Sequence, residues 1–428
     1  MTWRHSLRLS LRLLLRFLLR DLWARLLVYP SLVRNERSAQ ALRYYVAGRA
    51  RALGLAAAPD PVVLRPVPPA AALLTKPGLR RHPARHLRPR RPGSLLRTTI
   101  RTSGTSGSPL TIVQSLGAVI REQAFVYRQL RWIGWRPGGR RAWIRGDIVC
   151  DAQPPDGRYW CRDWVGNVLM LSSYHLSGST MGGYVAALEA FDPVVIQAYP
   201  SSIGALANWL KACGRRYRGR ALRGVMTSSE TLEPAVRGAI ADAFGVNVFD
   251  WYGQAERVAA IGTCELGRYH VLTDYGGVEL RRGPDGRSEI IGTTLNNPAM
   301  PLSRYCTGDF VVASQPLACL CGRIYPVVDA VVGRQETILT LPDGRMVARL
   351  DRVFQGFDGR LVEGQVQYHG RGRFTLQIVA GAGWTTHDET ALNDAFLLRV
   401  PGVDVAIAHV EAVARGPNGK FAFIVHDP

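Results

Sequence analysis

Residues 98–111 read TTIRTSGTSGSPLT, and this stretch decides how the rest of the chain is interpreted. Residues 103–110 combine glycines, Ser and Thr hydroxyls and a proline, a composition typical of loops rather than of helix or strand interiors. Glycine has no Cβ, so successive backbone N–H groups of such a loop can face an anion, and the hydroxyls add donors. No Gly-Lys-Ser/Thr follows, which excludes a Walker A loop. The stretch indicates either a phosphate-binding loop or an ordinary Ser/Gly turn.

Further motifs follow the loop. They are SSETLEP (228–234), DWYGQAE (250–256), RYCTGD (304–309), GR (333–334) and a terminal GK (419–420). In this order the set resembles the motifs of adenylate-forming (AMP-binding) enzymes. The resemblance is to their phenylacetate–CoA ligase branch, which includes capsule-biosynthesis CapK-like and coenzyme F390 synthetase-like relatives. These relatives often lack the lysine that other members carry after the loop proline. In this chain the position is occupied by Leu110. The resemblance runs from about residue 98 to the C-terminus.

The positive charge of the chain is concentrated at its start. The net charge is +21, and residues 1–100 contain 20 Lys and Arg against three acids, whereas the other 328 residues contain 34 against 30. With 47% hydrophobic and 20% charged residues, the composition fits a soluble globular protein. Seven sparse cysteines do not form a secreted disulfide framework, so a reducing compartment, the cytoplasm, is expected.

Residues 3–28 predict an amphipathic helix, because Arg4, Arg8, Arg12, Arg16 and Arg20 recur every four residues with leucines between them. No apolar run is long enough for a transmembrane span. Three alternatives remain open. The leucine face packs on the chain's own domain, or it lies on the inner, anionic surface of a membrane, or it serves as a targeting or partner helix.

Residues 79–93 form a basic, proline-broken connector. The connector has no aromatic residues to stack on bases, so no nucleic-acid partner is expected. The default interpretation is a solvated connector, and the alternative is attraction for an acidic partner, such as a carrier protein or a CoA phosphate.

Strand-like runs alternate with helical patterns at 115–133, 184–190, 203–212 and 233–243, which predicts an α/β sheet with helices on its faces. The residues after 333 predict a small α+β domain. Three parts are therefore expected: a basic helical extension and connector packed on the large domain (1–97), a large ATP- and acid-binding domain with mixed sheets and helices (98–333), and a small mobile C-terminal domain (334–428). Ligands in such sheets lie beyond the carboxyl ends of the strands, where SSETLEP and DWYGQAE fall.

The resemblance assigns roles to individual residues. The β- and γ-phosphates of ATP would be held by the loop residues Ser103, Gly104, Thr105, Ser106 and Gly107. Glu256 would bind Mg²⁺, a role suited to a hard carboxylate oxygen. The adenosine would be held by Ser229, Glu230, Tyr252, Gly253, Asp309 and Arg334. For Ser229 and Glu230, a helix N-terminus is a structural alternative.

Two further roles concern the mobile C-terminal domain. Lys420 would swing into the site and bridge the substrate carboxylate and the α-phosphate, because a slim ammonium on a long stem can do this more readily than a guanidinium. It is one of only three lysines in a chain that otherwise uses arginine. Glu336 stands at the hinge position, where relatives usually carry aspartate.

A second constellation is a metal cluster. Cys264 and His270 in CELGRYH, with Cys319 and Cys321 in CLCG, would close a tetrahedral structural Zn²⁺ site, and the phenylacetate–CoA ligase branch has a similar pattern. Cys306 could substitute for one ligand, and buried free cysteines are the alternative.

The expected activity is that of an adenylate-forming acid–thiol ligase. ATP activates a small carboxylic acid as acyl-AMP, and the acyl group passes to the thiol of CoA or of a carrier-protein phosphopantetheine. Two alternatives remain: transfer to an amine or hydroxyl in polysaccharide or natural-product synthesis, and a non-catalytic, membrane-associated nucleotide-binding scaffold. Candidates for the acid pocket are Tyr174, His175, Met181 and Tyr199.

Overall fold

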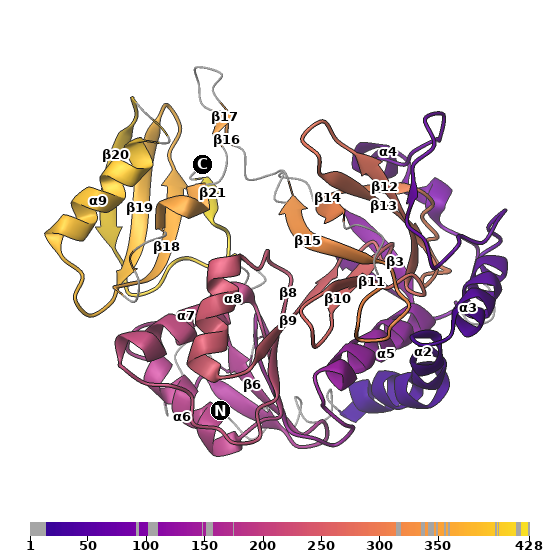
Figure 1. Cartoon of the computed structure of the whole chain (residues 1–428), viewed down its shortest axis with the longest axis horizontal. Coiled ribbons are helices and arrows are strands. Elements are labelled where there is room, and N and C mark those ends of the chain that lie inside the picture. The colour runs from indigo at the N-terminus through magenta and orange to yellow at the C-terminus, as the bar shows by residue number, and fades with distance from the viewer. Residues whose placement is uncertain are drawn as a thin grey trace. The chain divides into compact units, whose positions relative to one another are not determined.

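The computed structural model describes residues 14–90, 94–101, 110–147, 149–150, 157–173, 175–313, 318–334, 339–340, 346–347, 350–354, 357, 360–398, 400, 402–416 and 421–426. The chain divides into two compact units (Figure 1). The first unit comprises residues 2–137 and 249–334, and the second comprises residues 138–248 and 335–428. The predicted boundaries at 97 and 333 stay a prediction.

The first unit is built on a mixed β-sheet. Its strands, in spatial order, are β1 (Arg65–Pro66), β12 (Gly276–Arg282), β13 (Ser288–Thr294), β14 (Tyr305–Ala313), β15 (Val327–Arg334), β11 (Tyr269–Val271), β10 (Ala260–Thr263) and β9 (Asn247–Gly253). Only the β1–β12 pair is parallel, and the other pairs are antiparallel. Valine and isoleucine side chains such as Ile261, Val271, Ile290 and Val328 bury one face of this sheet.

Helices occupy the start of the first unit. They are η1 (Phe17–Asp21), η2 (Ala24–Val28), α2 (Tyr29–Asn35), α3 (Ala39–Ala52), α4 (Lys76–Arg81), η3 (Pro83–His86) and α5 (Leu116–Trp132). A buried network joins them to the sheet. Arg128 of α5 forms a two-bond ion pair with Asp274 at 2.7 and 3.2 Å, and Asn35 of α2 donates to the same carboxylate at 3.2 Å. None of the helices in the described ranges is long and apolar enough to span a membrane.

The strands on either side of the glycine-rich loop form a hairpin. Strand β2 (Arg97–Arg101) pairs antiparallel with β3 (Thr111–Ser115), in a register that places Arg101 opposite Thr111. The β-branched residues Thr111, Ile112 and Val113 favour this strand. The predicted helix at 115–133 is α5, which begins directly after β3, with Ser115 as its N-cap accepting from the Ala118 N–H at 3.1 Å.

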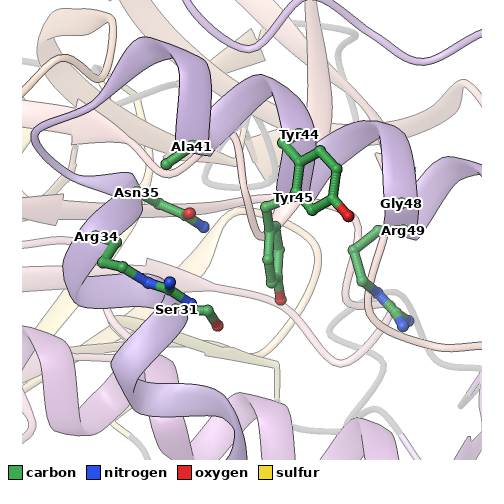
Figure 2. Close-up of a pocket in the computed structure, with 8 residues that line it drawn as sticks. All are labelled: Ser31, Arg34, Asn35, Ala41, Tyr44, Tyr45, Gly48 and Arg49. Carbon is green, nitrogen blue, oxygen red and sulfur yellow. The ribbon is translucent and has the colours of Figure 1, made fainter.

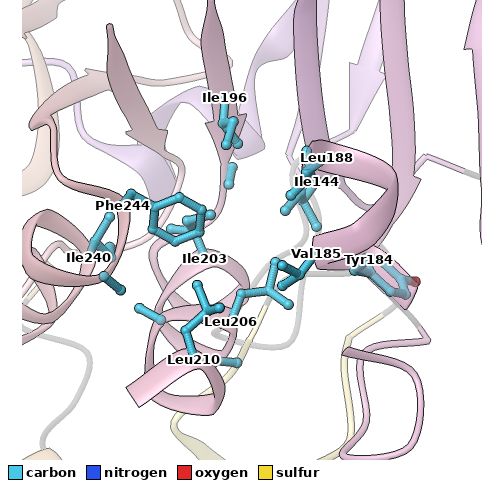
Figure 3. Close-up of a cluster of buried hydrophobic side chains, with 14 of the residues drawn as sticks. Ile144, Tyr184, Val185, Leu188, Ile196, Ile203, Leu206, Leu210, Ile240 and Phe244 are labelled. Atoms are coloured by element: carbon cyan, nitrogen blue, oxygen red, sulfur yellow. The ribbon is translucent and has the colours of Figure 1, made fainter. Parts of the chain in front are cut away.

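The second unit contains a largely parallel sheet. Its strands, in spatial order, are β8 (Gly224–Ser228), β7 (Val195–Ala198), β4 (Arg141–Arg145), β6 (Val168–Ser172) and β5 (Trp160–Asp163), of which only β5 is antiparallel. The helices α6 (Met181–Phe191), α7 (Pro200–Ala212) and α8 (Pro234–Phe244) supply the other half of its core. Figure 3 shows sheet residues such as Ile144 and Ile196 in one cluster with helical residues such as Val185 and Leu206. The predicted α/β alternation is confirmed.

A smaller sheet completes the second unit. Its order is β20 (Asp404–His409), β19 (Arg373–Ala380), β18 (Leu361–Tyr368) and β21 (Ile424–His426). Helix α9 (Thr386–Leu397) packs on it and begins with a reciprocal capping box between Thr385 and Asp388. Short elements precede it: β16 (Leu339–Thr340), β17 (Met346–Val347) and η5 (Leu350–Phe354). This is the α+β fold that the sequence predicts for the C-terminal residues.

Candidate functional site

Two motifs of the first unit exchange hydrogen bonds. Each supplies one tyrosine and one carboxylate. Tyr252, near the end of β9, donates its hydroxyl to Asp309 Oδ2 at 2.7 Å. Tyr305, which begins β14, donates its hydroxyl to Glu256 Oε1 at 3.0 Å. DWYGQAE and RYCTGD therefore form one structure, and Gly253 ends β9 beside it.

Both carboxylates of this pair are buried, with exposed fractions of 2% for Glu256 and 5% for Asp309. Burial, and then the neighbouring Asp309, raises the pKa of Tyr252 well above its ordinary value. The phenol therefore stays protonated and can only serve this carboxylate as a donor. Gln254 Nε2 donates in turn to the Tyr252 hydroxyl at 3.3 Å.

The backbone around Asp309 fixes where its carboxylate lies. Its N–H donates to Thr307 Oγ1 at 3.0 Å, and Gly308 adopts a φ of +72° while its N–H donates to Glu289 Oε1 at 3.1 Å. Only glycine adopts such a φ without strain. Across the sheet, Arg334 of β15 is the Cα partner of Asp309. The two predicted adenosine-binding positions are thus neighbours in adjacent strands.

The loop residues Ser103, Gly104, Thr105, Ser106 and Gly107 lie outside the described residues, but the strand that leaves the loop is described. Leu110 and Ile112 are buried in one cluster with Val258 and Tyr305. Gln114 Nε2 donates to the Ala255 carbonyl at 3.1 Å. The exit of the loop is therefore tied to the segment that carries Glu256.

Arg257 holds this junction together and was not found from the sequence. Its guanidinium donates to Gln114 Oε1 at 3.2 Å and is ion-paired with Glu122 of α5, while Tyr275 donates to the same Glu122 carboxylate at 2.6 Å. The sequence offers one indication of this network. Gln114 is a polar residue at a buried position of β3, and a buried amide needs hydrogen-bond partners.

Ser229 and Glu230 lie in the second unit, after β8. Ser229 is exposed and has a φ of +73°. The Glu230 carboxylate accepts from the Ser201 N–H at 2.9 Å, from Ser201 Oγ at 3.0 Å and from the Phe421 N–H at 2.8 Å. Burial raises the pKa of Glu230, and these hydrogen bonds oppose the rise. The hydrogen bonds of Glu230 thus join α7 to the residue that follows Lys420, and Lys420 itself lies outside the described residues.

A buried ion pair lies next to this carboxylate. Arg415 forms it with Glu363, with side-chain exposures of 5% and 7%, and Arg415 also donates to Ser201 Oγ at 3.0 Å. Burial raises the pKa of Glu363, and the neighbouring Arg415 opposes the rise. Sequence patterns gave no signal for this pair.

The acid-pocket candidates also lie in the second unit, apart from Tyr174, which is outside the described residues. His175 Nδ1 is 2.8 Å from Ser172 Oγ, and its ring stacks on Tyr159 at 4.7 Å. Tyr199 accepts from the Gly146 N–H at 3.5 Å. Met181 is buried in the hydrophobic core of the unit.

A group of metal-ligand atoms lies in the first unit. The ligand atoms of Cys264, His270, Cys319 and Cys321 are all within 4.8 Å of one another. Cys264 Sγ is 3.8 Å from Cys319 Sγ, and Cys321 Sγ is 3.4 Å from His270 Nε2. Around a tetrahedral Zn²⁺ ion, standard bond lengths give separations of about 3.8 Å between sulfurs and about 3.6 Å between sulfur and nitrogen.

The histidine of this group has the tautomer that ligation requires. His270 Nδ1 is 3.3 Å from the Tyr325 carbonyl, which can only accept, so Nδ1 carries the proton and Nε2 is left for a metal. Burial lowers the pKa of His270 to about 4, which keeps the imidazole neutral. The four residues therefore fit a metal ion. Cys306 is not a member of the group that the described residues form.

A separate pocket of about 440 Å³ lies between α2 and α3. Figure 2 shows Arg34 and Asn35 on one side of it, and Tyr44, Tyr45 and Arg49 on the other. None of the site residues predicted from the sequence lines this pocket.

The comparison with solved structures gives the class of the fold. The chain is similar in structure to 2-hydroxyisobutyryl-CoA ligase in its postadenylation state, in complex with R3-HIB-AMP, with a TM-score of 0.59 and 18% identity over 93% of this chain and 88% of that chain. The chain thus has the fold of an adenylate-forming ligase.

Two curated relatives are found by sequence. One is the phenylacetate-coenzyme A ligase of Thermus thermophilus, 27% identical over 253 residues, or 56% of this chain and 55% of the relative. The other is protein CapK of Staphylococcus aureus, 22% identical over 238 residues, or 56% of this chain and 53% of the relative. The matched region spans about half the length of each. No family model matches the chain. The predicted resemblance to the adenylate-forming superfamily is confirmed.

Proposed function

We propose that this chain uses ATP to activate a carboxylic acid and then passes the acyl group to a thiol. An oxygen of the acid attacks the α-phosphorus, the bond to the bridging oxygen breaks, and pyrophosphate leaves. The thiol of CoA or of a carrier-protein phosphopantetheine then displaces AMP from the acyl carbon. The observation that carries the proposal is the reciprocal pairing of Tyr252 with Asp309 and of Tyr305 with Glu256, beside the exit of the loop.

Asp309 would bind the ribose. One carboxylate presents two oxygens, which matches a pair of vicinal hydroxyls, and its buried position gives each hydrogen bond more strength than it would have in water. Tyr252 holds one of those oxygens at 2.7 Å and so fixes the rotamer of the carboxylate before the nucleotide arrives. Its ring would lie against the adenosine, and Arg334, in the neighbouring strand, would contact the ribose or a phosphate.

Glu256 would supply a carboxylate oxygen to Mg²⁺, which when bound neutralises charge on the phosphates. The residues 103–107 would then receive the β- and γ-phosphates on backbone N–H groups and hydroxyls. The contacts of Gln114 and Arg257 support this, because they tie the exit of the loop to the segment that carries Glu256. Charge neutralisation and positioning supply most of the catalysis in such reactions.

Lys420 would bridge the substrate carboxylate and the α-phosphate. The N–H of Phe421, the residue that follows Lys420, donates to Glu230 at 2.8 Å. Ser229 and Glu230 would line the adenine pocket in the conformation that carries out adenylation. Glu336 would be the hinge about which the C-terminal domain moves when Lys420 swings into the site.

The cysteine and histidine group would hold a structural Zn²⁺ ion. Four protein ligands close the coordination sphere, which leaves no position for a substrate. The ion would join the turn after β10 to the segment 319–321.

A second candidate acceptor is an amine or hydroxyl of a polysaccharide or natural product. The observation that favours it is the sequence relationship to CapK, which matches over 238 residues.

We place the reaction in the cytoplasm, where ATP and reduced thiols are available.

The test is acid-dependent exchange of pyrophosphate into ATP with a panel of aromatic and aliphatic acids. The unmodified chain is expected to give exchange with at least one acid, and Lys420→Ala is expected to lower it by about 10²-fold or more. Lys211→Ala, on the surface of α7, is the matched control and should leave exchange unchanged. No exchange with any acid, in a chain that still binds ATP, would favour the scaffold. Mass spectrometry of the acylated acceptor then separates a thiol from an amine or hydroxyl.

A further inference from the structure

The first described turns of the chain present large apolar side chains to solvent. Seven residues with exposed fractions between 41% and 67% form what we call the leucine face: Leu14, Leu15, Leu18, Leu19, Trp23, Leu26 and Leu27. One row, Leu15, Leu19, Trp23 and Leu27, has a spacing of four residues, and the other contains Leu14, Leu18 and Leu26, with the half-buried Leu22 between the last two. In η1 and η2 the N–H groups bond five residues back, as Leu22 does to Phe17, so each turn holds more residues than the 3.6 of an α-helix. When such wider turns alternate with ordinary α-helical turns, the average turn comes close to four residues. Residues four apart then stay on one side of the helix.

The opposite side of these turns carries charge, and it is this side that packs on the domain. The buried Asp21 accepts a short hydrogen bond from the Tyr127 hydroxyl of α5. Arg25 donates to the same hydroxyl at 3.4 Å, and its guanidinium lies 4.8 Å from the centre of the Tyr127 ring. Ala24 is fully buried on this side.

The polarity of this helix is therefore inverted relative to an ordinary surface helix, which buries its apolar stripe. The alternative in which the leucines pack on the chain's own domain does not hold for the seven exposed side chains of the leucine face. Isolated exposed leucines are normal on protein surfaces, but a contiguous apolar patch marks a site of interaction.

Charge identifies the occupant. Residues 1–100 contain 20 basic residues and three acids, and all three acids have partners within the chain. Asp21 is paired with Arg20, Glu36 accepts from Trp132 at 2.8 Å, and Asp60 lies 3.7 Å from Arg65. The leucine face thus lies in a strongly positive segment, and Arg16 is exposed beside it.

We propose that the leucine face docks on an anionic lipid bilayer, with the helix parallel to the surface. The apolar rows would enter the boundary between headgroups and acyl chains, where Trp23 is well suited to lie. Arg16, which is exposed beside the leucine face, would meet anionic headgroups. A second copy of this chain fits less well, because it would bring two positively charged segments together.

The experiment is sedimentation of the full chain with vesicles of phosphatidylcholine alone or with phosphatidylglycerol added. We expect pelleting with the anionic vesicles that weakens as NaCl is raised. The variant Leu19→Ser/Leu26→Ser/Leu27→Ser should lower the partition constant by at least about tenfold, since each leucine loses its apolar contribution to insertion. The matched control is Val63→Ser/Leu96→Ser/Leu398→Ser, whose side chains are 51%, 68% and 82% exposed.

Three results would overturn the proposal. One is the absence of pelleting by the unmodified chain, and another is equal pelleting by both triple variants. The third is a concentration-dependent dimer, detected by analytical ultracentrifugation without lipid, that the leucine-face variant abolishes.

Circular dichroism melts of all three chains check that the variants fold. If the leucine-face variant melts early, quenching of tryptophan fluorescence by bilayer-embedded quenchers in the Trp23→Phe variant replaces it. Loss of a quenched component supports docking, and no change contradicts it.

Discussion

The candidate-site carboxylates of the first unit, Glu256 and Asp309, are held differently from Glu230 and Glu363 of the second. In the first unit, Glu256 and Asp309 each accept from a neutral tyrosine hydroxyl. In the second, Glu363 is paired with the guanidinium of Arg415, and Glu230 accepts from two backbone N–H groups and a serine. A tyrosine orients a carboxylate without cancelling its charge, whereas an arginine cancels it. The first arrangement suits binding of a cation or a diol, and the second suits joining of chain segments.

The largest loss of stability confined to one unit is expected from substitution of the cysteine and histidine group. Cys319→Ser/Cys321→Ser should remove a bound Zn²⁺ ion and destabilise the first unit by several kcal/mol, because metal-binding energy in such sites is folding energy. Metal content by mass spectrometry and hydrogen exchange by peptide would measure this. Protection should fall around 260–275 and 319–325 while the second unit stays protected.

The control for the metal is Cys213→Ser, at an exposed cysteine, which should keep both metal and protection. A chain purified with no zinc that does not gain stability when Zn²⁺ is added would show that these are ordinary free cysteines.

The next effect tests the charge pair. Arg415→Ala should destabilise the second unit by about 3–5 kcal/mol, because it leaves Glu363 buried without its cation. Burial already raises the pKa of Glu363, so the folded state takes up a proton more readily than the unfolded state. The penalty should therefore be larger at pH 8 than at pH 5. Urea unfolding at the two pH values measures it.

Arg415→Ala/Glu363→Gln is the matched variant for this pair and should recover much of the lost stability. Equal losses in the single and double variants would mean that the pair is not what holds the segments together.

A smaller effect is expected from the tyrosine in the first unit. Tyr252→Phe keeps the ring and removes the hydroxyl that orients Asp309. Acid-dependent pyrophosphate exchange should fall by about tenfold, in line with loss of one hydrogen bond to a charged group, about 1.5 kcal/mol. Tyr368→Phe, in the small sheet, should not alter exchange. If Tyr252→Phe lowers the melting temperature but leaves pyrophosphate exchange unchanged, the tyrosine stabilises the fold and does not position Asp309 for the nucleotide.

The sequence predicted the features that depend on local pattern. Alternating apolar runs gave the order of β7, α7, β8 and α8, and the spacing of Cys319 and Cys321 gave the metal-ligand group. The composition of residues 103–107 predicts a loop, and these residues lie outside the described ones; the strands before and after them, β2 and β3, pair antiparallel.

Features that depend on tertiary partners could not be predicted. The partners of Glu230 lie 29 and 191 residues away in the chain, and no short motif encodes such contacts. The amphipathic pattern of the first helix also gave no indication of which face packs, because its inward side is fixed by Tyr127, more than one hundred residues later. Arg257 was missed for the same reason, since its partners come from β3 and α5.

The central claim is that Asp309 and Glu256 belong to one ATP site, and equilibrium binding of ATP with Mg²⁺ to the intact chain tests it most directly. Isothermal titration calorimetry should give one site per chain in the unmodified protein, with affinity lowered by about 10²-fold in Asp309→Asn and with the Mg²⁺ dependence lost in Glu256→Gln. Asp285→Asn, on an exposed turn, should bind like the unmodified chain. Unchanged ATP affinity in both site variants would contradict the account.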